Sequence, residues 1–259
     1  MMRNPAWVVH GIVWRSLDQP VGVPVHRRVC RGDLVLLASV SRMHTPEAVR
    51  FPPETEPRRL DDNRTWQRQE AEAALRHSTL LNGYSAAGGV LPFYYGCIVG
   101  SCAGLTDLLA QNAGRYRALL RRVDGCTEIH IVVRSKTGSV RAPEQREHAG
   151  GEAETARLRT ARKLREVAKS TMLQSLIGAV APLAREVIEG PLRPARPDLM
   201  LEAELLVSRR MLRRLTELVK SYALHLEGLD CVVEITGPWP PYAFGHPAGL
   251  QTKSVTNEE

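Results

Sequence analysis

Apolar residues follow two different periods along this chain, and their order predicts an α+β protein. Apolar and β-branched runs predict strands over 6–14 and 33–40, and the second is dense enough in Leu and Val to be buried on both faces. Apolar positions at helical spacing predict a helix over 65–81, which Gly83 would end. With the Gly-rich linker that follows, these elements predict an N-terminal α+β domain over 1–88.

Beyond residue 88 the order strand, helix, strand occurs twice. Strands are predicted over 90–99, 126–133, 199–207 and 229–235, and helices from residue 101 on, over 152–181 and over 209–226. This is the split β-α-β order of a ferredoxin-like domain, with a helical segment at about 136–197 inserted between the middle strands. We therefore expect a ferredoxin-like domain over 89–245, with an antiparallel sheet and helices on one face. The polar tail 246–259 is expected to be disordered.

The last predicted strand runs into a segment rich in proline and aromatic residues. The segment reads Gly237-Pro238-Trp239-Pro240-Pro241-Tyr242-Ala243-Phe244-Gly245, in a chain that is only 5% aromatic. Proline fixes φ and removes a backbone donor, which predicts a stiff, extended exit from the sheet. Rigid rings lose little entropy on docking, so they suit binding to a partner or locking the two domains together. The alternative is that the rings cap the core of their own domain.

This segment resembles the C-terminal signature of the gas vesicle GvpL/GvpF family. Val90-Leu91-Pro92-Phe93-Tyr94-Tyr95-Gly96 is similar to the family's internal motif, with Tyr94-Tyr95 where the family has Arg-Phe. Glu128-Ile129 stands where the family has Glu-Trp. The resemblance runs from about Trp7 to Phe244.

The resemblance implies two α+β domains and a non-enzymatic assembly or minor structural protein. It implies that the protein is cytoplasmic and attaches to the growing gas vesicle. The implied partners are the small hydrophobic shell protein and other accessory vesicle proteins. Which of the two paralogous roles the chain has stays open.

The charge of the chain allows an acidic partner. The formal net charge is +7, and the excess arginines are spread along the chain without a zinc-finger, helix-turn-helix or RNA-binding motif, which argues against a nucleic-acid partner. Cations are mildly unfavourable in the first turns of a helix, so a cluster there hints at docking to an acidic protein. The alternative is a solvated face paired with Glu217 and with Glu202 or Glu204. The cluster consists of Arg209, Arg210, Arg213 and Arg214.

Candidate enzyme chemistry is limited to Gly100-Ser101-Cys102-Ala103-Gly104, which fits a nucleophile elbow. A Cys102-dependent hydrolase is therefore an alternative function, and a basic nucleic-acid-binding protein is another. An elbow belongs to a parallel sheet, so a helix start capped by Ser101 is favoured. The histidines lack metal-ligand spacing, and the sequence suggests no cofactor. The five cysteines lack a Cys-x-x-Cys pair, which predicts reduced thiols. No apolar run is long enough for a signal peptide or a membrane span, which predicts a cytosolic protein without a membrane partner.

Overall fold

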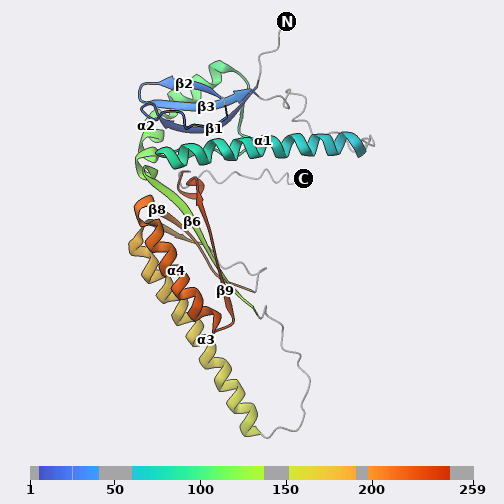
Figure 1. The fold of residues 1–259 in the computed structure, drawn as a ribbon, viewed down its shortest axis with the longest axis vertical. Helices are drawn as coiled ribbons and strands as arrows, with labels where there is room; N and C mark the ends of the chain where they lie inside the picture. The colour runs from blue at the N-terminus through green and yellow to red at the C-terminus, as the bar shows by residue number, and fades with distance from the viewer. Residues whose placement is uncertain (1–5, 25, 41–59, 137–151, 191–197, 246–259) are drawn as a thin grey trace, which may run out of the picture. The chain divides into compact units, whose positions relative to one another are not determined.

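The computed structural model describes residues 6–24, 26–40, 60–136, 152–190 and 198–245 (Figure 1). It is a mixed α/β structure with two antiparallel sheets, and its contacts divide into two compact units. Unit 1 comprises the described residues up to Cys126 together with those from Trp239 onward, and unit 2 comprises Thr127–Pro238. The chain therefore leaves unit 1 once and returns to it.

Unit 1 is a sheet with a helix packed on each face. Its strands have the order β2-β3-β1-β4, and β5 also pairs with β1. The long helix α1 packs on one face through Leu81 and Tyr84, and α2 packs on the other through Leu105 and Leu109. Because both faces are covered, the central strand β3 is buried on both, as its sequence predicts. The elements are β1 (Trp7–Trp14), β2 (Arg27–Arg31), β3 (Leu34–Val40), α1 (Leu60–Ala87), β4 (Leu91–Pro92), β5 (Ile98–Val99), α2 (Cys102–Val123) and α5 (Tyr242–Gly245).

The prediction that Gly83 ends the first helix is wrong. The helix α1 continues to Ala87, and the backbone N–H groups of Gly88 and Gly89 both donate to the Tyr84 carbonyl at 3.1 Å. A Cβ atom on Gly83 would come within 2.4 Å of a Val23 methyl group. Gly83 therefore serves close packing inside the helix instead of termination.

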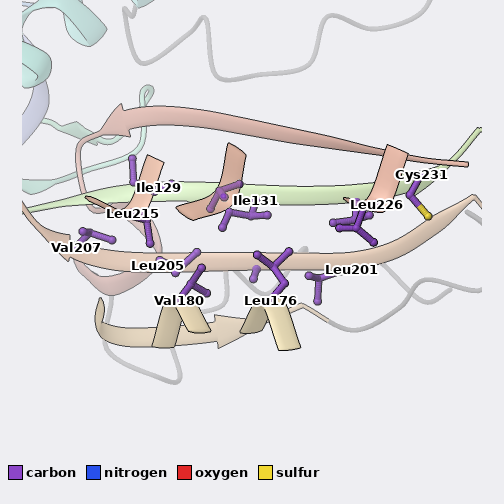
Figure 2. Packing of buried hydrophobic residues seen from close by; sticks show 13 residues of the cluster. Ile129, Ile131, Leu176, Val180, Leu201, Leu205, Val207, Leu215, Leu226 and Cys231 are labelled. Carbon is purple, nitrogen blue, oxygen red and sulfur yellow. The ribbon is translucent and has the colours of Figure 1, made fainter. Parts of the chain in front are cut away.

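Unit 2 has the element order β-α-β-β-α-β and the strand order β7-β8-β6-β9. Alternate residues of β8 such as Leu201 and Leu205 are buried, while Glu202 and Glu204 between them are only partly covered. The buried face carries both helices, and Figure 2 shows the side chains of this core gathered between the strands and the helices. The elements are β6 (Cys126–Ser135), α3 (Glu152–Val180), the short 3-10 helix η1 (Ala181–Leu183), β7 (Ala184–Glu189), β8 (Leu199–Ser208), the short 3-10 helix η2 (Arg209–Met211), α4 (Leu212–Glu227) and β9 (Cys231–Trp239).

Two features of this unit differ from the sequence prediction. The predicted strand 90–99 lies in the sheet of unit 1 as the short pieces β4 and β5, so unit 1 extends beyond residue 88. The first strand of the β-α-β-β-α-β order is β6, and the missing strand is Ala184–Glu189, inside the segment predicted to be a helical insertion. This strand lies at the edge of the sheet and carries Arg and Glu, which favour helices by propensity and are common at protected edges. The predicted disordered tail 246–259 lies outside the described residues.

A chain of hydrogen bonds through two histidines crosses the buried interior of unit 1. His10 Nδ1 lies 2.8 Å from His77 Nδ1, His10 Nε2 lies 2.8 Å from Ser39 Oγ, and His77 Nε2 lies 3.1 Å from the Phe93 carbonyl oxygen. The carbonyl only accepts, so His77 carries its proton on Nε2 and accepts at Nδ1. His10 then donates from Nδ1 and accepts at Nε2 from the Ser39 hydroxyl. Both rings are neutral in this arrangement, and each ring nitrogen of the two histidines has a hydrogen-bond partner.

A second proton on His77 would break this chain, because its Nδ1–H would then face the Nδ1–H of His10, and a second proton on His10 would reverse the hydrogen bond with Ser39. Burial and the neighbouring ring lower the pKa of His10 to about 3, and burial lowers the pKa of His77. The unfolded chain therefore binds more protons than the folded one below pH 6.5, so the free energy of unfolding decreases as the pH falls from 6.5 toward 3.

We expect the urea midpoint to fall between pH 6.5 and pH 5, because each buried histidine contributes up to about 1.4 kcal/mol per pH unit in this range. In His10→Gln the dependence on pH should be clearly shallower. The matched control is His225→Gln, since His225 is exposed on α4, and it should keep the parent's dependence. Equal dependence in the parent and in His10→Gln would contradict the assignment.

Candidate functional site

The internal motif, residues 90–96, sends three consecutive aromatic side chains to three different elements. Phe93 meets Tyr116 of α2 edge to face, with ring centroids 6.1 Å apart. Tyr95 meets His77 of α1 in the same manner at 5.5 Å. Tyr94 stacks on Tyr242 of α5 at 5.4 Å, with 19° between the ring planes. The motif therefore ties both helical layers of unit 1 to its C-terminal segment.

A turn between Tyr94 and Cys97 makes this divergence possible. The Cys97 N–H donates to the Tyr94 carbonyl at 3.3 Å, and Gly96 has a φ of +92°. Positive φ at the third position of a turn favours glycine, which explains the glycine of the motif. The same turn splits the predicted strand 90–99 in two. Its first piece lies so close to β1 that a Cβ atom on Gly11 would be 2.8 Å from the Leu91 oxygen.

The C-terminal motif begins as the end of an edge strand and then becomes one turn of helix. Strand β9 continues through Gly237 and Pro238 to Trp239, which is compatible with proline because β9 lies at the edge of its sheet. The Gly245 N–H then donates to the Pro241 carbonyl at 2.8 Å and closes α5. The expected extended exit is therefore correct up to Trp239 and wrong from Tyr242 onward.

The two motifs meet inside unit 1. Phe244 is fully buried, and the Arg122 guanidinium donates to its carbonyl oxygen at 3.4 Å. A Cβ atom on Gly245 would lie 3.1 Å from both Leu91 and Pro92, so the helical turn packs tightly on β4. The sequence marked both motifs, but it did not indicate that they contact each other.

The aromatic residues of the two motifs divide into core and surface. Phe244 is 0% exposed, whereas the exposed fractions of Trp239 and Tyr94 are 44% and 56%. Pro240 and Pro241 are buried and lead the chain from the surface to the core. The sequence analysis did not count Tyr94 among the site residues. The signal that could have identified it is that Tyr94 stands where the resembled family has Arg. A role of this segment in docking or in domain locking stays a prediction.

The predicted arginine cluster occupies η2 and the start of α4. Arg210, Arg213 and Arg214 are exposed, and Arg213 Nε lies 2.9 Å from a Glu217 carboxylate oxygen, as the solvated-face alternative expects. Glu202, in contrast, pairs with His130 at 3.4 Å. Arg209 also has interactions of its own. An acidic partner for this cluster stays a prediction.

The segment around Cys102, which resembles a nucleophile elbow in sequence, forms the start of helix α2. The Ser101 hydroxyl accepts from the Gly104 N–H at 3.0 Å and caps α2, and Cys102 packs against the core of unit 1. Cys102 and the other four cysteines all fall in the described ranges, and all are free thiols. Within those ranges no three His, Cys, Asp or Glu side chains gather closely enough to hold a metal ion. None of the described helices has the apolar length that a membrane span requires.

Comparison with known proteins places these two motifs within one family. The family model described as "Gas vesicle synthesis protein GvpL/GvpF" matches residues 36–246. The crystal structure of the gas vesicle protein GvpF from Anabaena sp. PCC7120 is similar, with a TM-score of 0.62 and 16% identity over 95% of this chain and 98% of that one. GvpF from Microcystis aeruginosa gives a TM-score of 0.59 and 15% identity over 94% of this chain and 100% of that one. These two likenesses show a shared fold. No curated protein sequence matches the chain.

Because Phe244 fills the core, Phe244→Ala should lower the free energy of unfolding by about 3–5 kcal/mol. The change should be visible as a lower urea midpoint of tryptophan fluorescence. Phe244→Leu keeps most of the volume and should cost less than about 1.5 kcal/mol. Trp239→Ala, at a half-exposed position, should change the midpoint much less than Phe244→Ala. Equal midpoints for the parent and Phe244→Ala would contradict the placement of this ring.

Proposed function

This chain belongs to the gas vesicle GvpL/GvpF family, and we propose that it is a non-enzymatic accessory or minor structural protein of gas vesicle assembly. The observation that carries the proposal is the family match over residues 36–246, which spans both signature motifs. The similarity of the fold to GvpF from two organisms supports it. We place the protein in the cytoplasm, attached to the growing gas vesicle.

The partners that we propose are the small hydrophobic gas vesicle shell protein and other accessory vesicle proteins. A shell subunit that is not yet incorporated would expose apolar surface, which promotes aggregation unless another protein covers it. Aromatic side chains on a rigid support are suited to covering such a surface, because they bury a large area and lose little entropy. Half-exposed Trp239 and exposed Tyr94 provide such side chains in unit 1.

The way in which these rings are held supports this assignment. Tyr94 rests flat against Tyr242, and Tyr242 belongs to the helical turn that buried Phe244 anchors. Tyr94 lies in a turn, but its ring is therefore supported by a helical turn that is anchored in the core of unit 1. Such preorganisation reduces the entropy lost on binding.

For unit 2 we propose a ferredoxin-like fold. Its β-α-β-β-α-β element order, its strand order β7-β8-β6-β9 and the packing of α3 and α4 on one core support this interpretation. The assignment concerns the scaffold, and the proposed docking residues Trp239 and Tyr94 lie in unit 1.

We expect affinity-tagged protein, co-expressed with the small shell protein, to retain that protein on a column. Trp239→Ala combined with Tyr94→Ala should reduce retention at least about fivefold, because exposed aromatic residues contribute strongly to interfaces. The matched control is Leu75→Ala, which removes an exposed apolar side chain from α1 of the same unit and should retain the shell protein normally. The far-ultraviolet circular dichroism of all variants should equal that of the parent.

Two results would count against this proposal in different ways. Normal retention by the double variant would keep the shell partner and move its contact away from the two rings. If the parent protein neither retained the shell protein nor supported vesicle formation in a host that lacks its own copy, the assembly role itself would fail.

A further inference from the structure

Helix α3 extends beyond the hydrophobic core of unit 2, to which it belongs. Its C-terminal half supplies Leu176 and Val180 to the core of unit 2, and Figure 1 shows its N-terminal half continuing past the end of α4. Toward this half, Arg165 forms an ion pair with Asp230 at 2.9 Å and donates a hydrogen bond to the Gly228 carbonyl oxygen. Among the described residues these are the last polar contacts between α3 and the rest of unit 2. Every described residue from Ala156 to Ala168 is exposed. We call residues 156–168 the α3 arm.

The α3 arm carries an apolar side that is not a continuation of the core stripe. Leu164 and Val167 are 65% and 57% exposed. At about 100° per residue they lie on the side of the helix roughly opposite to Leu176 and Val180. Ala161 and Ala168 flank Leu164 on the same side, and such small residues allow another helix to approach closely. A helix with Ala, Leu and Val on its outer side is shaped to pack against a second helix.

The α3 arm is also strongly basic, and two of its cations border the apolar stripe, because at about 100° per residue Arg157 lies beside Leu164 and Lys163 beside Val167. The arm contains one carboxylate, Glu166, and five cations, which are Arg157, Arg159, Arg162, Lys163 and Arg165. That carboxylate pairs with Lys169 at 3.1 Å, and Arg165 pairs with Asp230. Among the described residues, no carboxylate forms an ion pair with the other four cations. The arm therefore offers positive charge beside an apolar stripe.

This combination discriminates between possible occupants. A second copy of the same arm would bring cations against cations, which opposes association. A lipid surface usually takes a basic helix whose apolar side carries Trp, Phe or several Leu residues, whereas this side carries one Leu, one Val and small residues. Nucleic acid would neutralise the cations but leave Leu164 and Val167 exposed. An amphipathic helix with an aliphatic stripe and flanking Glu or Asp fits both the stripe and the cations that border it.

We propose that the α3 arm is a docking site for an acidic amphipathic helix of a partner protein. Leu164 and Val167 pack against the aliphatic stripe of the partner, and Arg157 and Lys163, which border them, pair with its carboxylates. The surface lies in unit 2 and is defined without reference to the shell protein or to the rings of unit 1. The two proposals can therefore fail independently.

The test uses the full-length protein and a fluorescein-labelled synthetic peptide of about three heptads, with Leu at a and d and Glu at e and g. Fluorescence anisotropy should show saturable binding that weakens as the salt concentration rises to about 1 M, where the Debye length is about 3 Å. The same peptide with Lys in place of Glu should not bind. On binding of the acidic peptide, hydrogen exchange of the amides of residues 156–168 should slow.

Three variants separate the contribution of the apolar stripe from that of the cations. Leu164→Asp with Val167→Asp should weaken binding at least about tenfold, because it removes the apolar stripe. Leu224→Asp is the matched control, since Leu224 is 74% exposed on α4, and it should bind like the parent. Arg157→Glu with Lys163→Glu should lose the acidic peptide and gain the Lys peptide.

Four outcomes would overturn the proposal. They are no saturable binding of the acidic peptide at low salt, equal binding of the Lys peptide, no effect of the Leu164 and Val167 changes, and slowed exchange elsewhere than in the arm. Binding of the arm to phosphatidylserine-containing vesicles without binding of the acidic peptide would assign the surface to lipid instead. The changed side chains are exposed, so we expect the helices to be retained. Circular dichroism of each variant checks this.

Discussion

The packing of the C-terminal helical turn into unit 1 is the contact on which the arrangement of this chain depends. Arg122 and Phe244 are 122 residues apart in sequence, yet they are joined by a hydrogen bond within one unit. Without this contact, unit 1 would lose one of its fully buried aromatic side chains, and Tyr94 would lose its stacking partner. The whole of unit 2 is therefore an excursion of the chain that begins and ends in unit 1.

The buried sheet of unit 1 imposes a second constraint. Because helices cover both faces of β1 and β3, a polar side chain in this layer must find its partners inside the protein. The Ser39, His10 and His77 side chains achieve this with the Phe93 carbonyl, which belongs to the same motif that sends Tyr94 toward α5. The polar chain thus fixes the internal motif from one side while the C-terminal turn fixes it from the other. The position of Tyr94 depends on both.

Local periodicity predicted most elements but not their long-range partners. The helical glycine Gly83 gave a false stop signal, because its role is a close approach to another segment. The edge strand 184–189 was missed since its residues favour helices, and only pairing with β8 makes it a strand. The sequence marked both motifs of the site through their proline and aromatic residues. It could not show that Phe244 turns inward while Trp239 stays at the surface, because that depends on the helical turn at Tyr242.

The return of the chain to unit 1 also sets an order in time. During synthesis, residues 127–238 emerge from the ribosome before the segment that completes the first unit. Unit 2 has all of its strands and both of its helices once β9 has emerged, whereas unit 1 waits for residue 245 with an incomplete core. Tyr94 therefore gains its stacking partner Tyr242 only after all of unit 2 has emerged. A translation product that ends before Tyr242 lacks this stack, so only the internal motif itself holds its Tyr94 ring.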